Sequence, residues 1–142
     1  GAGLYKISRK GTRFSSSEIW RKKNDMFNHW STPLYHDGHL YGMFSFKKYG
    51  NGPLQCVELK SGKIKWSQDG YGPGNVILSG DHLIALADDG VLSLVKATPS
   101  KYTELARKKV LDGKCWSTPI LSNGLVFARS TSEAVCLDAG KR

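Results

Sequence analysis

Cysteine, acidic residues and long apolar runs are all scarce in this sequence. Its three cysteines, Cys56, Cys115 and Cys136, include no Cys-x-x-Cys pair, and an odd number cannot all pair with one another. Since Cys56 and Cys136 lie in alternating apolar runs, we expect free thiols that pack as small hydrophobic residues. No window approaches 18 consecutive apolar residues, which excludes a membrane-spanning helix.

Basic residues outnumber acidic ones, 21 to 12, and the net charge is +9. A basic surface of this size attracts nucleic acid or anionic lipid in many proteins. Here the lysines alternate with apolar residues, as in Lys63-Ile64-Lys65-Trp66, which is typical of a strand exposed on one side. We therefore predict that the charge lies on solvated outer strands and loops, and that nucleic acid is not a partner.

The sequence repeats itself. EIWRKK at residues 18–23 recurs as ELARKK at 104–109, and HWSTPL at 29–34 recurs as CWSTPI at 115–120, both at a shift of 86 residues. A weaker copy of the segment 33–41 lies halfway, at a shift of 43 residues. Periods of this size are typical of helical solenoids or of four-stranded propeller blades.

The turns within each repeat decide between these two architectures. Each unit has two apolar runs joined by a two-residue turn: Asp37-Gly38, Gly80-Asp81 or Asn123-Gly124. Such pairs are strong β-hairpin signals, because the turn requires positive φ angles. A third and a fourth strand follow in each unit. Four antiparallel strands for every 43 residues make one propeller blade.

We therefore predict an all-β chain of about 13 strands with no helix longer than two turns. The segment 102–111 has helix-forming residues, but it aligns with a predicted strand at 18–21, so we expect a strand there too. Residues 1–142 form a partial β-propeller domain of about 3¼ blades from an incomplete 6–8-bladed propeller. The predicted divisions are 1–30 (end of one blade), 31–73 (second blade), 74–116 (third blade) and 117–142 (start of a fourth).

One segment, CVELKSGKIKW at residues 56–66, resembles the tryptophan-docking motif of pyrroloquinoline quinone-type, or BamB-like, β-propellers. In that motif a small residue packs in the third strand, Ser-Gly supplies a turn, and the tryptophan wedges between blades. Residues 136–141 resemble the start of another copy, and residues 4–8 with Trp20 resemble a copy stretched by an insertion. The repeat that runs from Leu94 to Ala106 lacks both the acidic residue and the tryptophan.

The resemblance implies a non-catalytic interaction or scaffold module of an exported bacterial protein, periplasmic or in the cell envelope. The alternative is a fragment of a quinone-dependent dehydrogenase. In those enzymes the quinone stacks on a tryptophan and often on a disulfide between adjacent cysteines, beside a calcium ion. This sequence has no adjacent cysteine pair, and the acidic ligands cannot be placed on it. We therefore expect no cofactor, no metal and no catalytic residues.

Three short motifs are better explained as structure than as sites. Gly70–Gly74 lacks the Lys-Ser/Thr and the helix of a phosphate loop. His36 and His39 flank a turn without further metal ligands. Asp88-Asp89-Gly90 lacks the remaining oxygen ligands of a calcium loop.

Blade topology instead predicts a recognition face. Loops between second and third strands and loops between blades lie at the same end of the blades, and loops on a rigid scaffold often carry binding. Aromatic and charged side chains gather in these loops: His29, Trp30, Lys47, Lys48, Tyr49, Tyr71, Asp88, Asp89 and Trp116. This composition favours a protein or glycan partner. The alternative is that Trp30 and Trp116 are packing residues. Incomplete end blades would also expose apolar faces, so we expect a dimer or completion by further blades.

Overall fold

Four antiparallel sheets follow one another along the chain in the computed structural model, which describes residues 1–23, 26–44 and 51–140. The first sheet contains β1 (Ala2–Lys10) and β2 (Arg13–Lys22). The second contains β3 (Leu34–His36), β4 (His39–Met43), β5 (Leu54–Glu58) and β6 (Ile64–Gln68). The third contains β7 (Asn75–Ser79), β8 (His82–Leu86), β9 (Val91–Lys96) and β10 (Glu104–Lys109). The fourth contains β11 (Ile120–Ser122), β12 (Leu125–Arg129) and β13 (Ala134–Asp138).

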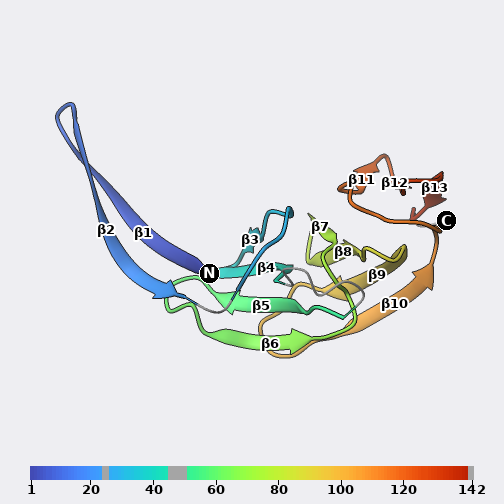
Figure 1. Cartoon of the computed structure of the whole chain (residues 1–142), viewed down its shortest axis with the longest axis horizontal. Coiled ribbons are helices and arrows are strands. Elements are labelled where there is room, and N and C mark those ends of the chain that lie inside the picture. The colour runs from blue at the N-terminus through green and yellow to red at the C-terminus, as the bar shows by residue number, and fades with distance from the viewer. Residues whose placement is uncertain (24–25, 45–50, 141–142) are drawn as a thin grey trace.

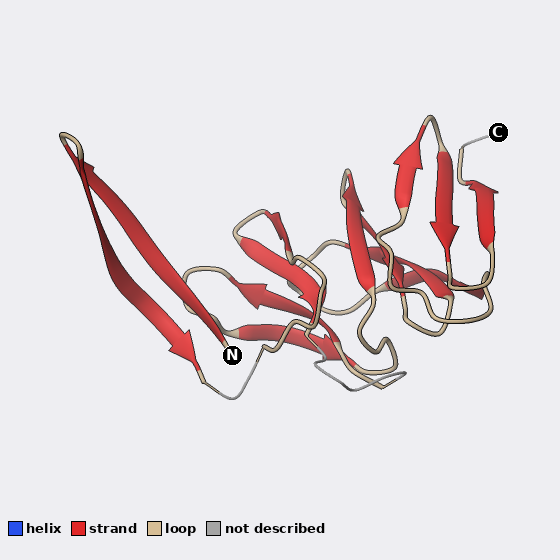
Figure 2. Ribbon diagram, turned by 45° about the horizontal axis from the view of Figure 1, so that its top comes forward, coloured by secondary structure: helices blue, strands red, loops and turns tan. Residues whose placement is uncertain are grey.

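Every sheet is a meander in which sequential strands pair with one another. In Figure 1, β6 and β10 follow the convex outer side of the chain, whereas β3, β7 and β11 lie on the concave side. No helix occurs among the described residues, as Figure 2 shows, and the segment 104–109 is a strand. The predicted fold class is therefore confirmed: the chain is all-β and consists of partial propeller blades.

The predicted hairpin turns are present at the first connection of each repeat. Asp37 and Gly38 have φ angles of 47° and 75°, and Asn123 and Gly124 have 50° and 76°. Positive φ at both turn positions matches the right-handed twist of the flanking strands. The turns therefore fix the registers of the hairpins that open the second and fourth sheets.

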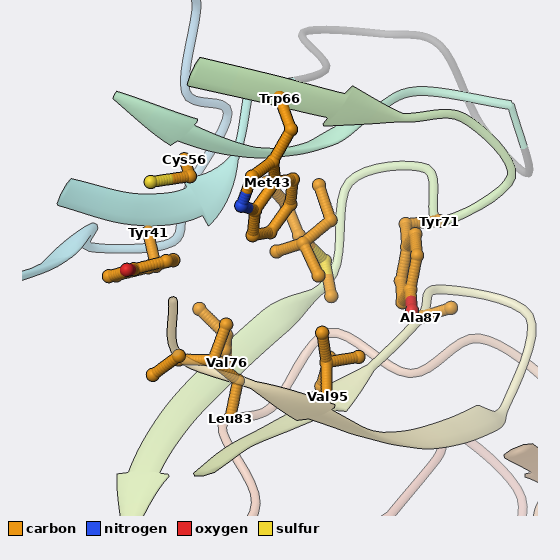
Figure 3. Packing of buried hydrophobic residues seen from close by; sticks show 12 residues of the cluster. Tyr41, Met43, Cys56, Trp66, Tyr71, Val76, Leu83, Ala87 and Val95 are labelled. Atoms are coloured by element: carbon orange, nitrogen blue, oxygen red, sulfur yellow. The ribbon is translucent and has the colours of Figure 1, made fainter. Parts of the chain in front are cut away.

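The largest core lies between the second and third sheets (Figure 3). On the second sheet a row of paired residues, Tyr41, Cys56 and Trp66, crosses β4, β5 and β6. These side chains face the apolar residues Val76, Leu83, Ala85 and Val95 of the third sheet. The second and third sheets thus bury one face against each other, which is the contact that a stack of propeller blades requires.

Tryptophan side chains link the outer strand of one sheet to the next sheet. The Trp66 indole N–H donates to the Thr98 carbonyl oxygen at 2.7 Å, and its ring lies 5.6 Å from that of Tyr102. Trp20 in β2 donates in the same way to the Leu59 carbonyl oxygen at 2.8 Å. Trp20 therefore docks like Trp66, although the motif around it is stretched.

The first sheet is a long hairpin that projects from the rest of the chain (Figures 1 and 2). All residues from 5 to 19 are exposed, including Ile7 and Phe14. Only the base of the hairpin packs, through Ala2 and Trp20, against the core of the second sheet.

The three cysteines are free, but only two of them are buried. Cys56 and Cys115 lie in cores, whereas Cys136 is exposed, so the prediction that Cys136 packs as a buried residue is wrong. The reason is that Cys136 pairs with Phe127 and Ile120 across the fourth sheet, on a face that no described residue covers.

Candidate functional site

Two tryptophans from different repeats contact each other. Trp30 lies just before β3 and Trp116 just before β11, and their ring centroids are 5.6 Å apart at an interplanar angle of 61°. The His29 ring lies 4.2 Å from that of Trp30. The exposed fractions are 37% for Trp30 and 50% for Trp116. The pair therefore forms an edge-to-face aromatic surface that is open to solvent.

The third sheet anchors the backbone beside Trp116. Its residue at the corresponding repeat position is Pro73, which is buried and smaller than tryptophan. Asn75 at the start of β7 is also buried; its side-chain amide donates to the Trp116 carbonyl oxygen at 3.1 Å and accepts from the Thr118 hydroxyl at 3.3 Å. The backbone of Trp116 is thus anchored, while its indole remains exposed.

The β8–β9 turn lies beside the segment that leads to Trp116. The Cys115 N–H donates to the Asp88 carbonyl oxygen at 2.9 Å. The Asp88 side chain is buried with its Oδ2 atom 4.0 Å from Nζ of Lys114, whereas Asp89 is exposed. Burial raises the pKa of the neighbouring Cys115 thiol. Of the two aspartates predicted for the recognition face, Asp89 is therefore at the surface and Asp88 is not.

Tyr71 lies in the interior of the chain and not on its surface. Its side chain is fully buried, its hydroxyl is hydrogen-bonded to that of Tyr102 at 2.7 Å, and the Arg107 guanidinium lies 5.0 Å from its ring centroid. Burial and the Glu104 carboxylate raise the pKa of the Tyr102 phenol. Tyr71 thus packs the second sheet against the third.

Three further residues of the predicted face, Lys47, Lys48 and Tyr49, lie outside the described residues.

Of the predicted face, the structure brings together His29, Trp30 and Trp116, with Asp89 on a neighbouring turn. Sequence reasoning placed both tryptophans at the same end but missed their direct contact. The middle repeat position holds Pro73 instead of a tryptophan, but this difference does not by itself predict that the outer two meet.

A cleft with a volume of about 490 Å³ lies between the hairpin turns of the second and third sheets, at the end of the blades opposite the tryptophan pair. Across it, Nε2 of His36 lies 3.3 Å from Oδ1 of Asp81. Among residues 1–23, 26–44 and 51–140, no group of three His, Cys, Asp or Glu side chains is arranged to hold a metal ion. Nor does this part of the chain contain a helix long and apolar enough to cross a membrane.

Sequential four-stranded meanders with tryptophan-docked junctions define the chain as part of a β-propeller. Comparison with solved structures agrees: the chain is similar to BamB from Moraxella catarrhalis, with a TM-score of 0.50 and 14% identity over 94% of this chain. The chain spans about half (53%) of that protein's length. No protein-family model and no curated protein matches the sequence. At this identity the likeness shows the fold, and activity and partners have to be argued from the site.

Proposed function

We propose that this chain is a non-catalytic interaction module of an exported bacterial propeller protein, and that it binds a protein through the Trp30–Trp116 pair. The observation that carries the proposal is the contact of two exposed tryptophans, of which Trp116 has an anchored backbone. Tryptophan is one of the residue types enriched in the energetic centres of protein interfaces. A rigid aromatic pair loses little conformational entropy when a partner covers it.

The surroundings of the pair favour a protein over a glycan. Asp89 and Lys114 are exposed near Trp116 and supply charges of both signs for a polar rim. An apolar centre with a polar rim is the usual anatomy of a protein interface. The location in the periplasm or cell envelope is part of the proposal, and its support is the resemblance of residues 56–66 to the motif of exported propellers.

Site-specific photo-crosslinking tests this proposal. A benzophenone amino acid replaces Trp30 or Trp116 in the full-length protein in its native host, and Tyr35 serves as a control position. Tyr35 is an aromatic residue of β3 that is 61% exposed. We expect positions 30 and 116 to crosslink to the same discrete protein, and position 35 not to. Glycan adducts at positions 30 and 116 would replace the protein partner with a glycan, and identical adducts at all three positions would refute the site.

We propose further that the blade divisions fall at residues 30, 73 and 116, since each of these residues lies in a connection between two sheets. The isolated chain should self-associate through the face of the fourth sheet that bears Ile120 and Phe127, because both side chains are exposed on it. Light scattering coupled to size exclusion should give about twice 15.7 kDa, and Phe127→Lys should restore the monomer. Phe14→Lys, on the projecting hairpin, is the matched control and should leave the dimer intact. A monodisperse monomer of the unmodified chain over a tenfold concentration range would contradict this.

A further inference from the structure

The outer strands of three sheets share one irregularity. In β2, β6 and β10 the pairing with the neighbouring strand skips one residue, which forms a β-bulge. The residue that resumes the pairing is Trp20 in β2, Trp66 in β6 and Ala106 in β10. These three residues therefore occupy the same position in their sheets, and they differ in one respect: the third is not a tryptophan.

At the first two junctions the tryptophan fills the space toward the next sheet. Trp20 and Trp66 each donate an indole N–H to a backbone carbonyl oxygen of that sheet, at 2.8 Å and 2.7 Å. The Trp20 ring also packs on the turn at Gly62, where an added Cβ would lie 3.0 Å from the indole. Each docked indole thus supplies both apolar contact and one donated hydrogen bond.

At the third junction the alanine leaves a pocket. Its volume is about 390 Å³, its surface is almost entirely apolar, and it lies between the third and fourth sheets. Its apolar walls come from both sheets and include Ile84, Leu94, Ala106, Val126, Leu137 and Ala139. An apolar protein cavity of only ~150 Å³ is enough to bind benzene. This pocket therefore has room for a larger, bicyclic ring.

The fourth sheet also has a backbone carbonyl in the position of the one that accepts from a docked indole. In the second sheet, the N–H of Leu59 donates to the carbonyl oxygen of the turn residue Gly38 at 2.9 Å, and the Leu59 carbonyl accepts from Trp20. In the fourth sheet, the N–H of Ala139 donates in the same way to Gly124 at 2.7 Å. Ala139 thus holds the position of Leu59 and lines the pocket. In the third sheet the residue in this position is Ala97, whose N–H donates to Asp81, and Trp66 donates to the carbonyl of the next residue, Thr98. The acceptor for an N–H donor in the pocket would therefore be the carbonyl of Ala139 or of the residue after it.

We propose that this pocket is a binding site for a planar, indole-sized aromatic ring that carries one N–H donor. The ring would take the place that Trp20 and Trp66 fill at the other junctions. It comes either from a free small molecule or from a tryptophan side chain of a peptide. The site is independent of the Trp30–Trp116 pair, because none of the residues that line it belongs to that face.

Titration with indole, observed by the methyl resonances of Val126 and Leu137, tests the proposal on the unmodified chain. We expect saturable shifts of both methyl groups, and binding of 1-methylindole at least tenfold weaker because it lacks the N–H. The peptide Gly-Trp-Gly forms the second arm. If this peptide binds at least as tightly as indole, the ligand is a tryptophan side chain. If indole binds and the peptide does not, the ligand is a small molecule.

Two variants complete the test. Ala106→Trp should fill the pocket, abolish indole binding and raise the melting temperature. Leu105→Trp adds an indole at the skipped residue of the same strand, which is exposed and does not line the pocket, and should leave binding within twofold. The absence of saturable shifts with both indole and the peptide would overturn the proposal. So would indole binding that survives in a folded Ala106→Trp chain.

Discussion

Replacement of Trp66 measures how much a docked indole contributes to the junction between two sheets. Trp66 is 8% exposed, its ring lies 5.9 Å from that of Tyr41 and 5.6 Å from that of Tyr102, and it donates to the Thr98 carbonyl. Trp66→Ala removes all of these contacts and leaves a cavity, so we expect a loss of about 3–5 kcal/mol in the free energy of unfolding.

A second substitution separates packing from hydrogen bonding. Trp66→Phe keeps an aromatic ring in the junction but leaves the Thr98 carbonyl without its donor, for which we expect a loss of about 1–3 kcal/mol. Urea denaturation gives both values from the shift of the midpoint, provided that the slope of unfolding free energy against urea is unchanged.

The control is a tryptophan that does not dock. Trp116 is half exposed, so Trp116→Ala should cost less than about 1 kcal/mol. The reasoning fails if Trp66→Ala costs no more than Trp116→Ala, since the indole would then not hold the sheets together. It also fails if Trp66→Phe costs as much as Trp66→Ala, because packing would then contribute nothing.

Three further predictions follow from burial and backbone geometry. A thiol reagent should label one cysteine per folded chain, the exposed Cys136, and three per unfolded chain; a native count of three would contradict the described cores. Gly62→Ala should lower stability more than Gly11→Ala does in urea denaturation, because both have positive φ but only Gly62 abuts Trp20; equal losses would refute the contact. Burial raises the pKa of the Tyr41 phenol, so the folded chain keeps this proton more tightly than the unfolded chain and loses stability as pH rises above about 10. Tyr41→Phe should reduce the fall in melting temperature between about pH 10 and 12 without abolishing it, because the pKa of the Tyr102 phenol is raised as well. An unchanged fall would argue against the burial of Tyr41.

The repeat and its turns were readable from the sequence because they depend on local chemistry. The pairs Asp37-Gly38 and Asn123-Gly124 adopt the positive φ angles that their hairpins require. The repeat also predicted that residues 104–109 form a strand, against their helix-forming composition. The repeat was thus a better guide to the structure of this segment than the intrinsic helix propensity of its residues.

The recognition face was harder to predict, because it depends on which loops fold inward. Tyr71 follows β6 in a glycine-rich connection that suggested an exposed loop, yet its ring packs against Arg107 and its hydroxyl is hydrogen-bonded to that of Tyr102. The sequence likewise gave no sign that Trp30 and Trp116, separated by two repeats, would touch. Contacts of this kind depend on the angle between successive blades, which no local pattern encodes.

The length of the projecting hairpin formed by β1 and β2 is independent of how its base packs against the second sheet. The junction depends on Ala2 and Trp20 at the base, whereas every residue from 5 to 19 is exposed and supports no core. Residue pairs can therefore be added to or removed from the two strands together without moving the docked indole. The residues that set the length of the hairpin are therefore different from those that stabilise its junction with the second sheet. Related proteins could differ in the length of this hairpin and keep the same propeller.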